Sequence, residues 1–165
     1  MHRFSLSGRI RDVRPRRQGV EVLLECPAGP HLVWVPSRAD PGELAPGRYL
    51  TASGRLWRRR GRIASWLNLV AEELAVLAAA PPPVNQVAVS GVVRYPPRVR
   101  RGRWQLELAT EGGRVPVVTE APPDVAVGAA VHASGRLGAR HWIDRKTGGL
   151  RRWVYVEATR VVAQS

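Results

Sequence analysis

The chain has 165 residues, enough for one large domain or two small ones, and it carries 26 Lys and Arg against 13 Asp and Glu, a formal net charge of +13. Its 44% of hydrophobic residues exclude a disordered chain, its 16 Gly and 14 Pro exclude long helices, and a single cysteine, Cys26, excludes a disulfide framework. Because no apolar run would span a bilayer and no signal-peptide core precedes the first strand, we expect a soluble, cytoplasmic protein without a membrane partner. The basic excess predicts an anionic partner, since Lys and Arg neutralise phosphates.

Short alternating segments separated by turn residues predict strands throughout the first half of the chain. The segment 36–47 contains three prolines, so any helix there spans at most about one turn. Segment 71–77 is compatible with a helix, but its counterpart near the end of the chain is rich in β-branched residues, and we predict a strand. The expected strands cover 4–13, 20–26, 31–35, 49–57 and 63–76.

The second half of the chain repeats the first. The pentapeptide Ala-Ser-Gly-Arg-Leu at 52–56 recurs at 133–137, an offset of 81 residues, and other landmarks recur in the same order at offsets of 83 and 87. These landmarks are Ser7-Gly8 with Ser90-Gly91, Gly19 with Gly102, and Leu67, Leu69 and Ala71 with Val154, Val156 and Ala158. The strands expected in the second copy cover 87–95, 103–110, 114–119, 129–142 and 150–162.

The repeat predicts two domains, 1–77 and 84–165, joined by the Pro-rich linker 78–83. Five short strands in each copy, without a long helix, are typical of the small closed OB barrel. Glycines in mid-strand suit the bends that such a barrel needs, and they stand at Gly8, Gly54, Gly91 and Gly135. The expected fold is therefore all-β with two tandem five-stranded OB-fold barrels, and an SH3-like barrel is the alternative.

The alternation of side chains along the strands sorts the aromatic residues of the second copy. The face of its fourth strand opposite the apolar one carries Arg136, Arg140 and Trp142. In its fifth strand the same rule places Trp153 and Tyr155 outside the core. Outward aromatic side chains beside arginines suit unpaired bases, because a base stacks on the ring while Arg contacts the phosphate. Burial of these rings between two barrels is the alternative explanation.

In the first copy the same alternation places Trp34, Arg55, Trp57 and Trp66 on outward faces. Trp104, by contrast, shares the parity of the apolar residues of its strand, and we expect it in the core.

The loops between the first and second strands and between the fourth and fifth strands are basic in both copies. OB-folds use these two loops to close over an oligonucleotide, although a run of arginines is often only a solvated turn. The candidate phosphate-binding residues from these loops are Arg59, Arg60, Arg100 and Arg101.

The segment 135–153 contains the pattern G-x-L-x-x-R-x-W-x-D, followed by Gly148 and Arg152-Trp153. It resembles the hairpin of the bacterial single-stranded DNA-binding protein family, and Val87-Ala88-Val89-Ser90-Gly91 resembles the first strand of that family. The resemblance implies that Trp142 stacks on a base and that Trp34 stands where the third strand carries an aromatic residue. It also implies four OB-folds acting together, hence a homodimer of this two-barrel chain. The family's tail with an acidic tip has no counterpart in these 165 residues.

The resulting hypothesis is a protein that binds single-stranded nucleic acid, DNA preferred, with little sequence specificity, in replication, recombination or repair. A protein–protein adaptor with Trp-rich faces and a single-stranded RNA-binding protein are the alternatives. We expect no enzymatic activity, no cofactor and no metal, because the four histidines lack ligand spacing and no nucleophile or phosphate-loop pattern occurs.

Overall fold

The computed structural model describes the backbone of residues 2–36, 44–60 and 65–164, which form eleven strands and no helix. The expected all-β class is confirmed. The strands of the first half are β1 (His2–Arg16), β2 (Gly19–Cys26), β3 (Gly29–Pro36), β4 (Tyr49–Arg60) and β5 (Ser65–Leu77). Those of the second half are β6 (Asn85–Val93), β7 (Arg98–Arg100), β8 (Arg103–Thr110), β9 (Gly113–Thr119), β10 (Ala130–Ile143) and β11 (Leu150–Ala163).

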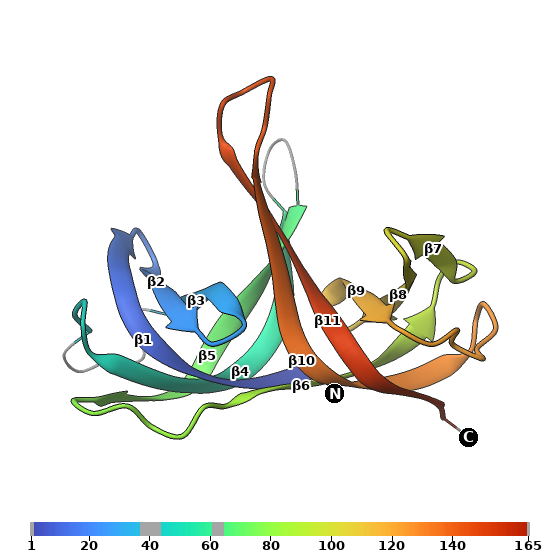
Figure 1. Cartoon of the computed structure of the whole chain (residues 1–165), viewed down its shortest axis with the longest axis horizontal. Helices are drawn as coiled ribbons and strands as arrows, with labels where there is room; N and C mark the ends of the chain where they lie inside the picture. Colours follow the sequence, from blue (N-terminus) through green and yellow to red (C-terminus); the bar gives the residue numbers. More distant parts are fainter. Residues whose placement is uncertain (1, 37–43, 61–64, 165) are drawn as a thin grey trace.

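Strand pairing closes each half into a ring. In the first half β1 pairs with β2, β2 with β3, β3 with β5, β5 with β4, and β4 with β1 again. Only the β3–β5 pairing among these is parallel. The second half repeats the same ring with β6, β8, β9, β11 and β10, and its β11–β9 pairing is parallel. This 1-2-3-5-4-1 ring is the OB topology, and we refer to the two rings as the first and second barrels (Figure 1).

Both cores follow the predicted alternation of side chains. Leu50, Ala52 and Leu56 of β4 are buried, as are Ala133 and Leu137 at the matching positions of β10. The β4 and β10 strands each carry a bulge, between Ser53 and Gly54 and between Ser134 and Gly135. A Cβ atom on Gly135 would lie 2.0 Å from the carbonyl oxygen of Glu157, so only glycine allows β10 and β11 to approach so closely there.

The two barrels share one sheet, because β1 pairs with β6 antiparallel. The pairing is centred on Phe4 and Val87, which are counterparts in the sequence repeat. An unpaired first strand is the physical route by which a second chain would pair with this one. That edge is instead filled within the chain, and six strands run side by side in the order β5-β4-β1-β6-β10-β11.

The structure differs from the sequence-based expectations at two places and agrees with them at a third. The loop after β6 contains an additional short strand, β7, which pairs with β8. The segment 71–77 is strand, as expected, because it lies within β5. Trp104 is half-buried rather than enclosed in the core, because it stands near the start of β8, outside the buried stretch that contains Leu106 and Leu108.

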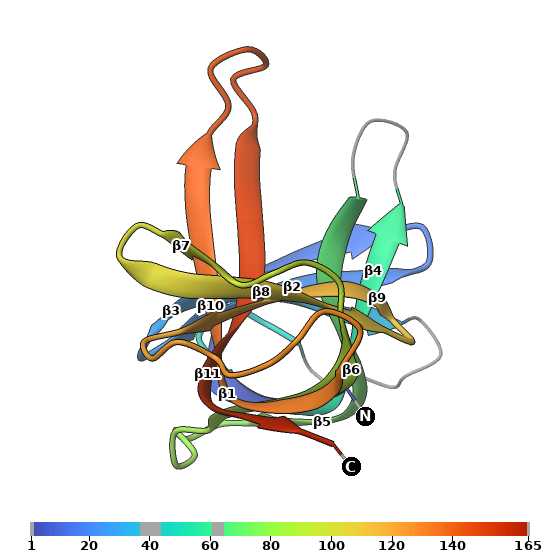
Figure 2. The same cartoon turned by 90° about the vertical axis from the view of Figure 1, so that its right-hand side faces the viewer.

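Two hairpins rise from the shared sheet on the same side of the molecule (Figures 1 and 2). The first arm consists of the outer ends of β4 and β5, and the second arm consists of the outer ends of β10 and β11 with their turn, residues 138–155. In Figure 2 the two arms stand beside each other above the second barrel. The arms carry most of the outward aromatic residues that the sequence singled out.

Candidate nucleic-acid interface

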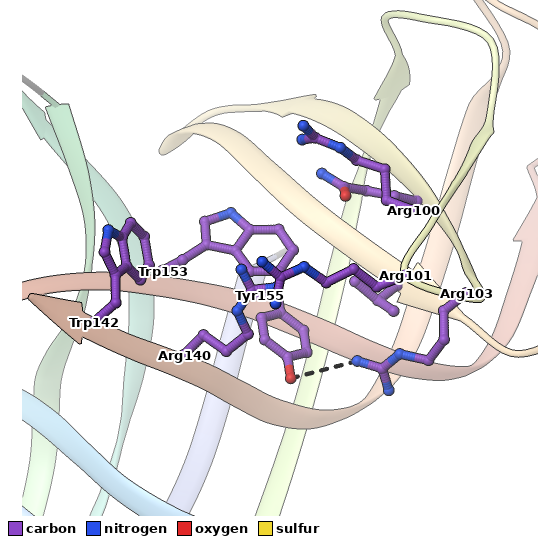
Figure 3. Close-up of a pocket in the computed structure, with 9 residues that line it drawn as sticks. Arg100, Arg101, Arg103, Arg140, Trp142, Trp153 and Tyr155 are labelled. Carbon is purple, nitrogen blue, oxygen red and sulfur yellow. Dashed lines mark hydrogen bonds between the residues drawn. The ribbon is translucent and has the colours of Figure 1, made fainter. Parts of the chain in front are cut away.

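A groove of about 410 Å³ lies where the second arm meets the face of the second barrel (Figure 3). We call it the arm groove. Its walls come from the β7–β8 hairpin, β8, β9 and both strands of the arm. The residues that line it are Arg100, Arg101, Arg103, Gln105, Val118, Arg140, Trp142, Trp153 and Tyr155. Every charged side chain among them is an arginine, so the groove attracts anions.

Three aromatic side chains line the arm groove. Trp142 is 45% exposed and therefore offers a free ring face. Trp153 is half-buried, and its ring centroid lies 4.6 Å from that of Tyr155. Arg140 is the cross-strand partner of Trp153, and its guanidinium carbon lies 5.6 Å from the Trp153 ring centroid. The arm thus alternates ring and cation, an arrangement that suits a base and its phosphate.

Tyr155 has the predicted outward parity but is only 8% exposed. Its cross-strand partner is Gly138, and a Cβ atom there would lie 2.4 Å from a Tyr155 ring carbon, so the ring lies flat against the glycine backbone. Arg103 covers another side, with its guanidinium carbon 5.7 Å from the ring centroid and its Nη2 donating to the Tyr155 hydroxyl at 3.5 Å. The buried Tyr155 ring therefore packs against the Trp153 ring and holds it in place.

The β7–β8 turn holds the basic wall of the groove. Arg101 and Gly102 both have positive φ, 52° and 75°, which makes the turn tight. Arg100 and Arg101 are exposed, whereas Arg103 is half-buried. Sequence analysis did not identify Arg103, Gln105 or Val118 as residues that line this groove.

The turn at the end of the second arm is ordered by Asp144, the acidic residue of the family-like pattern. Its carboxylate accepts a hydrogen bond from the Lys146 backbone N–H at 2.8 Å and another from the Arg151 side chain at 3.0 Å. These two contacts hold the pKa of Asp144 below its usual range. The carboxylate therefore stays charged and accepts both hydrogen bonds.

The first barrel carries a separate alternation of cation and ring. The guanidinium carbon of Arg55 lies 4.7 Å from the ring centroid of Trp57, and that of Arg59 lies 5.8 Å from the ring centroid of Trp34. Trp57 is 40% exposed and Trp34 is half-buried. We call these four residues the first-barrel row, and none of them lines the arm groove.

The remaining candidates from the sequence fall elsewhere. Arg136 is exposed but lies outside the arm groove and is ion-paired with Glu157. The side chains of Arg60 and Trp66 lie outside the part of the structure that is described.

Each arm also touches the opposite barrel. In the first arm, the Arg58 backbone N–H donates to the Gly112 carbonyl at 2.6 Å, and the Arg58 side chain donates to the Arg114 carbonyl at 2.8 Å. Gly112 and Arg114 lie at and just after the β8–β9 turn of the second barrel. These two hydrogen bonds connect the first arm to the second barrel.

The second arm packs on His31 of the first barrel, which is 2% exposed. Burial lowers the pKa of His31 to about 4, and the nearby charges of Arg152 and His141 on the arm act in the same direction, whereas a hydrogen bond with the Leu137 backbone raises it. His31 is therefore neutral at pH 7 and acts as a packing residue between the two barrels.

Among the residues that the structure describes, no three His, Cys, Asp or Glu side chains are grouped so that they could hold a metal ion. The same part of the chain contains no helix long and apolar enough to cross a membrane.

No family model and no curated protein sequence matches the chain. Solved structures do match it over its whole length. The single-stranded DNA-binding protein of Thermus aquaticus superposes with a TM-score of 0.74 at 20% identity, covering 100% of this chain and 93% of that one. A deletion and substitution variant of the same protein gives a TM-score of 0.76 at 20% identity, with 100% and 95% covered. The chain thus has the fold of bacterial single-stranded DNA-binding proteins, which confirms the fold that the resemblance implied.

Proposed function

We propose that this protein binds single-stranded DNA with little sequence specificity, through the arm groove and the first-barrel row. The observation that carries the proposal is the arm groove itself, where the two tryptophans Trp142 and Trp153 stand among four arginines and no acidic residue lines the wall. Likeness of the whole chain to single-stranded DNA-binding proteins of known structure supports it.

The chemistry of the groove favours single strands over duplexes. A tryptophan ring stacks on any base, because every base has a π face, whereas a duplex hides those faces. Arginines attract either form through its phosphates, with an affinity that falls as salt rises. Trp142 and Arg140 lie on the same face of β10, so a base and its neighbouring phosphate can be held together. Low sequence specificity follows, since stacking and charge do not distinguish one base from another.

We also propose that the two barrels are separate OB-fold domains, 1–77 and 84–165, joined by the linker 78–83, and that the protein is a cytoplasmic, non-enzymatic component of replication, recombination or repair. Binding that covers unpaired DNA without altering it suits each of these processes.

We also propose a homodimer of four OB-folds, with a contact surface other than the edge of the first strand. Because β1 and β6 already pair with each other, two chains would instead meet through the face of the six-stranded sheet that points away from both cores. Half-buried small side chains lie near the middle of that face, beside the exposed Arg3 and Gln86 at the β1–β6 seam. They include Ser5, Thr51, Ser53, Ala88 and Ser134. Light scattering should give about twice the chain mass of 18.2 kDa, and a monomer that still binds DNA tightly would exclude the dimer.

Titration of the intrinsic tryptophan fluorescence with DNA and RNA oligomers of matched sequence tests the binding proposal. Single-stranded DNA should quench the emission as bases stack on the exposed tryptophans, and a duplex of equal length should bind more weakly at moderate salt. A stronger response to RNA would favour the RNA-binding alternative. No quenching by any oligomer would refute nucleic-acid binding and favour the adaptor, whose tryptophans would contact a protein.

A further inference from the structure

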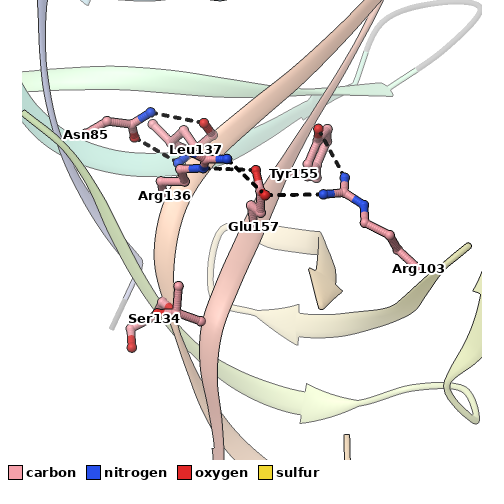
Figure 4. A network of polar contacts seen from close by, with 8 residues as sticks. Asn85, Arg103, Ser134, Arg136, Leu137, Tyr155 and Glu157 are labelled. Carbon is pink, nitrogen blue, oxygen red and sulfur yellow. Dashed lines mark hydrogen bonds and ion pairs between the residues drawn. The ribbon is translucent and has the colours of Figure 1, made fainter. Parts of the chain in front are cut away.

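Three charged side chains form a compact cluster at the edge of the arm groove (Figure 4). Arg136 donates to both carboxylate oxygens of Glu157, at 3.0 and 3.1 Å, and Arg103 donates to one of them at 3.2 Å. The Glu157 side chain is 24% exposed and that of Arg103 is 31% exposed, so both remain within reach of solvent. Two guanidinium groups converging on one carboxylate are also the arrangement that binds a phosphate.

The first barrel shows that its fold does not require an acidic residue at this position. By the sequence repeat, Arg55 is the counterpart of Arg136 and Val70 is the counterpart of Glu157. The cross-strand pairing is the same in both barrels, Arg55 with Val70 and Arg136 with Glu157. Without the acid, the Arg55 guanidinium rests on Trp57 and its Nε has no hydrogen-bond partner in the part of the chain that the structure describes. The two barrels thus have the same strand pairing at this position, but only the second barrel has an acidic side chain there.

The cluster stands between two grooves. Arg103 lines the arm groove and also a second groove of about 560 Å³, which Arg136 and Glu157 line as well. The second groove runs between β11 and the segment after β9, where Arg160 lies together with Glu120 and Asp124. A strand that leaves the arm groove along the barrel surface would pass Arg103 and reach Arg136 next. Glu157 is the acidic residue that contacts both arginines.

We propose that Arg103 and Arg136 form a phosphate site that Glu157 occupies in the free protein. A phosphodiester of the bound strand displaces the carboxylate, so Glu157 weakens binding at this point and keeps the strand exchangeable. This inference rests on the proposed function, because it assigns a further phosphate contact to the same strand. It also assigns a role to Arg136, which lies outside the arm groove.

Glu157→Gln in the full chain tests the inference, because the amide keeps the size of the side chain and removes its charge. Oligodeoxythymidylate affinity is measured at several NaCl concentrations for the wild type and the variant. The variant should bind about two- to fivefold more tightly at low salt, the size of effect expected of one exposed charge pair. Its log–log salt slope should be steeper by about 0.7, because one more positive charge is free to neutralise a phosphate. Adding Arg136→Ala to the variant should abolish the gain.

Glu72→Gln is the matched control. Glu72 is an exposed acid paired with Arg3 at 3.4 Å, and it lines neither groove, so the control changes the net charge by the same amount elsewhere. An equal gain in both variants would mean a general charge effect and would overturn the inference. Unchanged or weaker binding of Glu157→Gln would also overturn it.

Thermal melting of Glu157→Gln and of Glu157→Val, the residue type at the counterpart position, decides whether the acid is structural. Both variants should melt within a few degrees of the wild type, and a large loss of stability in both would overturn the inference. Wild-type protein that binds no oligomer would refute the proposed function, and this inference with it, whereas tight wild-type binding without a gain in Glu157→Gln refutes the inference alone.

Discussion

Trp142→Ala separates base stacking from charge at a single position of the arm groove. Trp142 is 45% exposed and stands on the second arm, away from both cores, so its removal should change the free energy of unfolding by less than about 0.5 kcal/mol. If its ring stacks on one base, the loss of binding free energy should be about 1–3 kcal/mol. That loss corresponds to a dissociation constant roughly 5- to 150-fold higher. The salt slope should not move, because no phosphate contact is lost.

Arg140→Ala, on the same face of β10, is the complementary variant. It should make the log–log salt slope shallower by about 0.7, because one phosphate contact is lost. Its guanidinium lies 5.6 Å from the Trp153 ring centroid, so a cation–π contact of about 0.5–1 kcal/mol is lost as well.

Fluorescence anisotropy of a labelled oligodeoxythymidylate at four or more salt concentrations measures affinity and slope together, and thermal melting measures stability. A Trp142→Ala protein with intact affinity and stability lowered by several kcal/mol would show that Trp142 is a packing residue. The assignment of the outer face of β10 would then be wrong, and Arg140 would lose its proposed role.

Three further outcomes are expected. The four arginines of the arm groove predict a salt slope of about −3 for single strands, and an affinity that does not change between low and moderate salt would exclude phosphate contacts. Gly135→Ala should destabilise the protein by roughly 1–3 kcal/mol or more, because its Cβ would lie 2.0 Å from a carbonyl oxygen, whereas Gly149→Ala, with its nearest atom at 3.4 Å, should melt like the wild type. The pKa of His31 is about 4 in the folded protein, below its ordinary value of 6.5. As the pH falls, the unfolded chain therefore binds a proton at this histidine before the folded protein does. The free energy of unfolding should decrease by about 3 kcal/mol between pH 6.5 and pH 4. His31→Leu should remove that part of the pH dependence in urea titrations, and an unchanged profile would show that His31 is solvated.

The fold could be predicted from the sequence because the repeat and the alternation of side chains can both be read along single strands. The pentapeptide at 52–56 and 133–137 marks β4 and β10, and counting in steps of two from it places Trp142 on the outer face. The same counting gave Tyr155 its outward parity but not its burial, because burial depends on the glycine across the strand and on Arg103 from β8.

Contacts between distant segments were not predictable in this way. Glu157 contacts Arg136 across one strand pair, but it contacts Arg103 only because the barrel closes, since the two residues are 54 positions apart in the chain. Burial of His31 depends on an arm contributed by the other barrel. The short strand β7 forms in a segment whose charge suggested an open loop. Each of these features requires a three-dimensional arrangement that periodicity along one strand does not contain.

The β1–β6 pairing makes the duplicated chain resemble a two-subunit assembly fused into one polypeptide. Its register sets Phe4 opposite its own counterpart Val87, and His2 and Leu6 opposite Val89 and Asn85, so the contact has the reciprocity of a two-fold axis. The strand pairing itself therefore aligns the halves. A chain cut between the barrels would retain a complementary strand edge on each fragment, so we expect the fragments to reassociate in the original register.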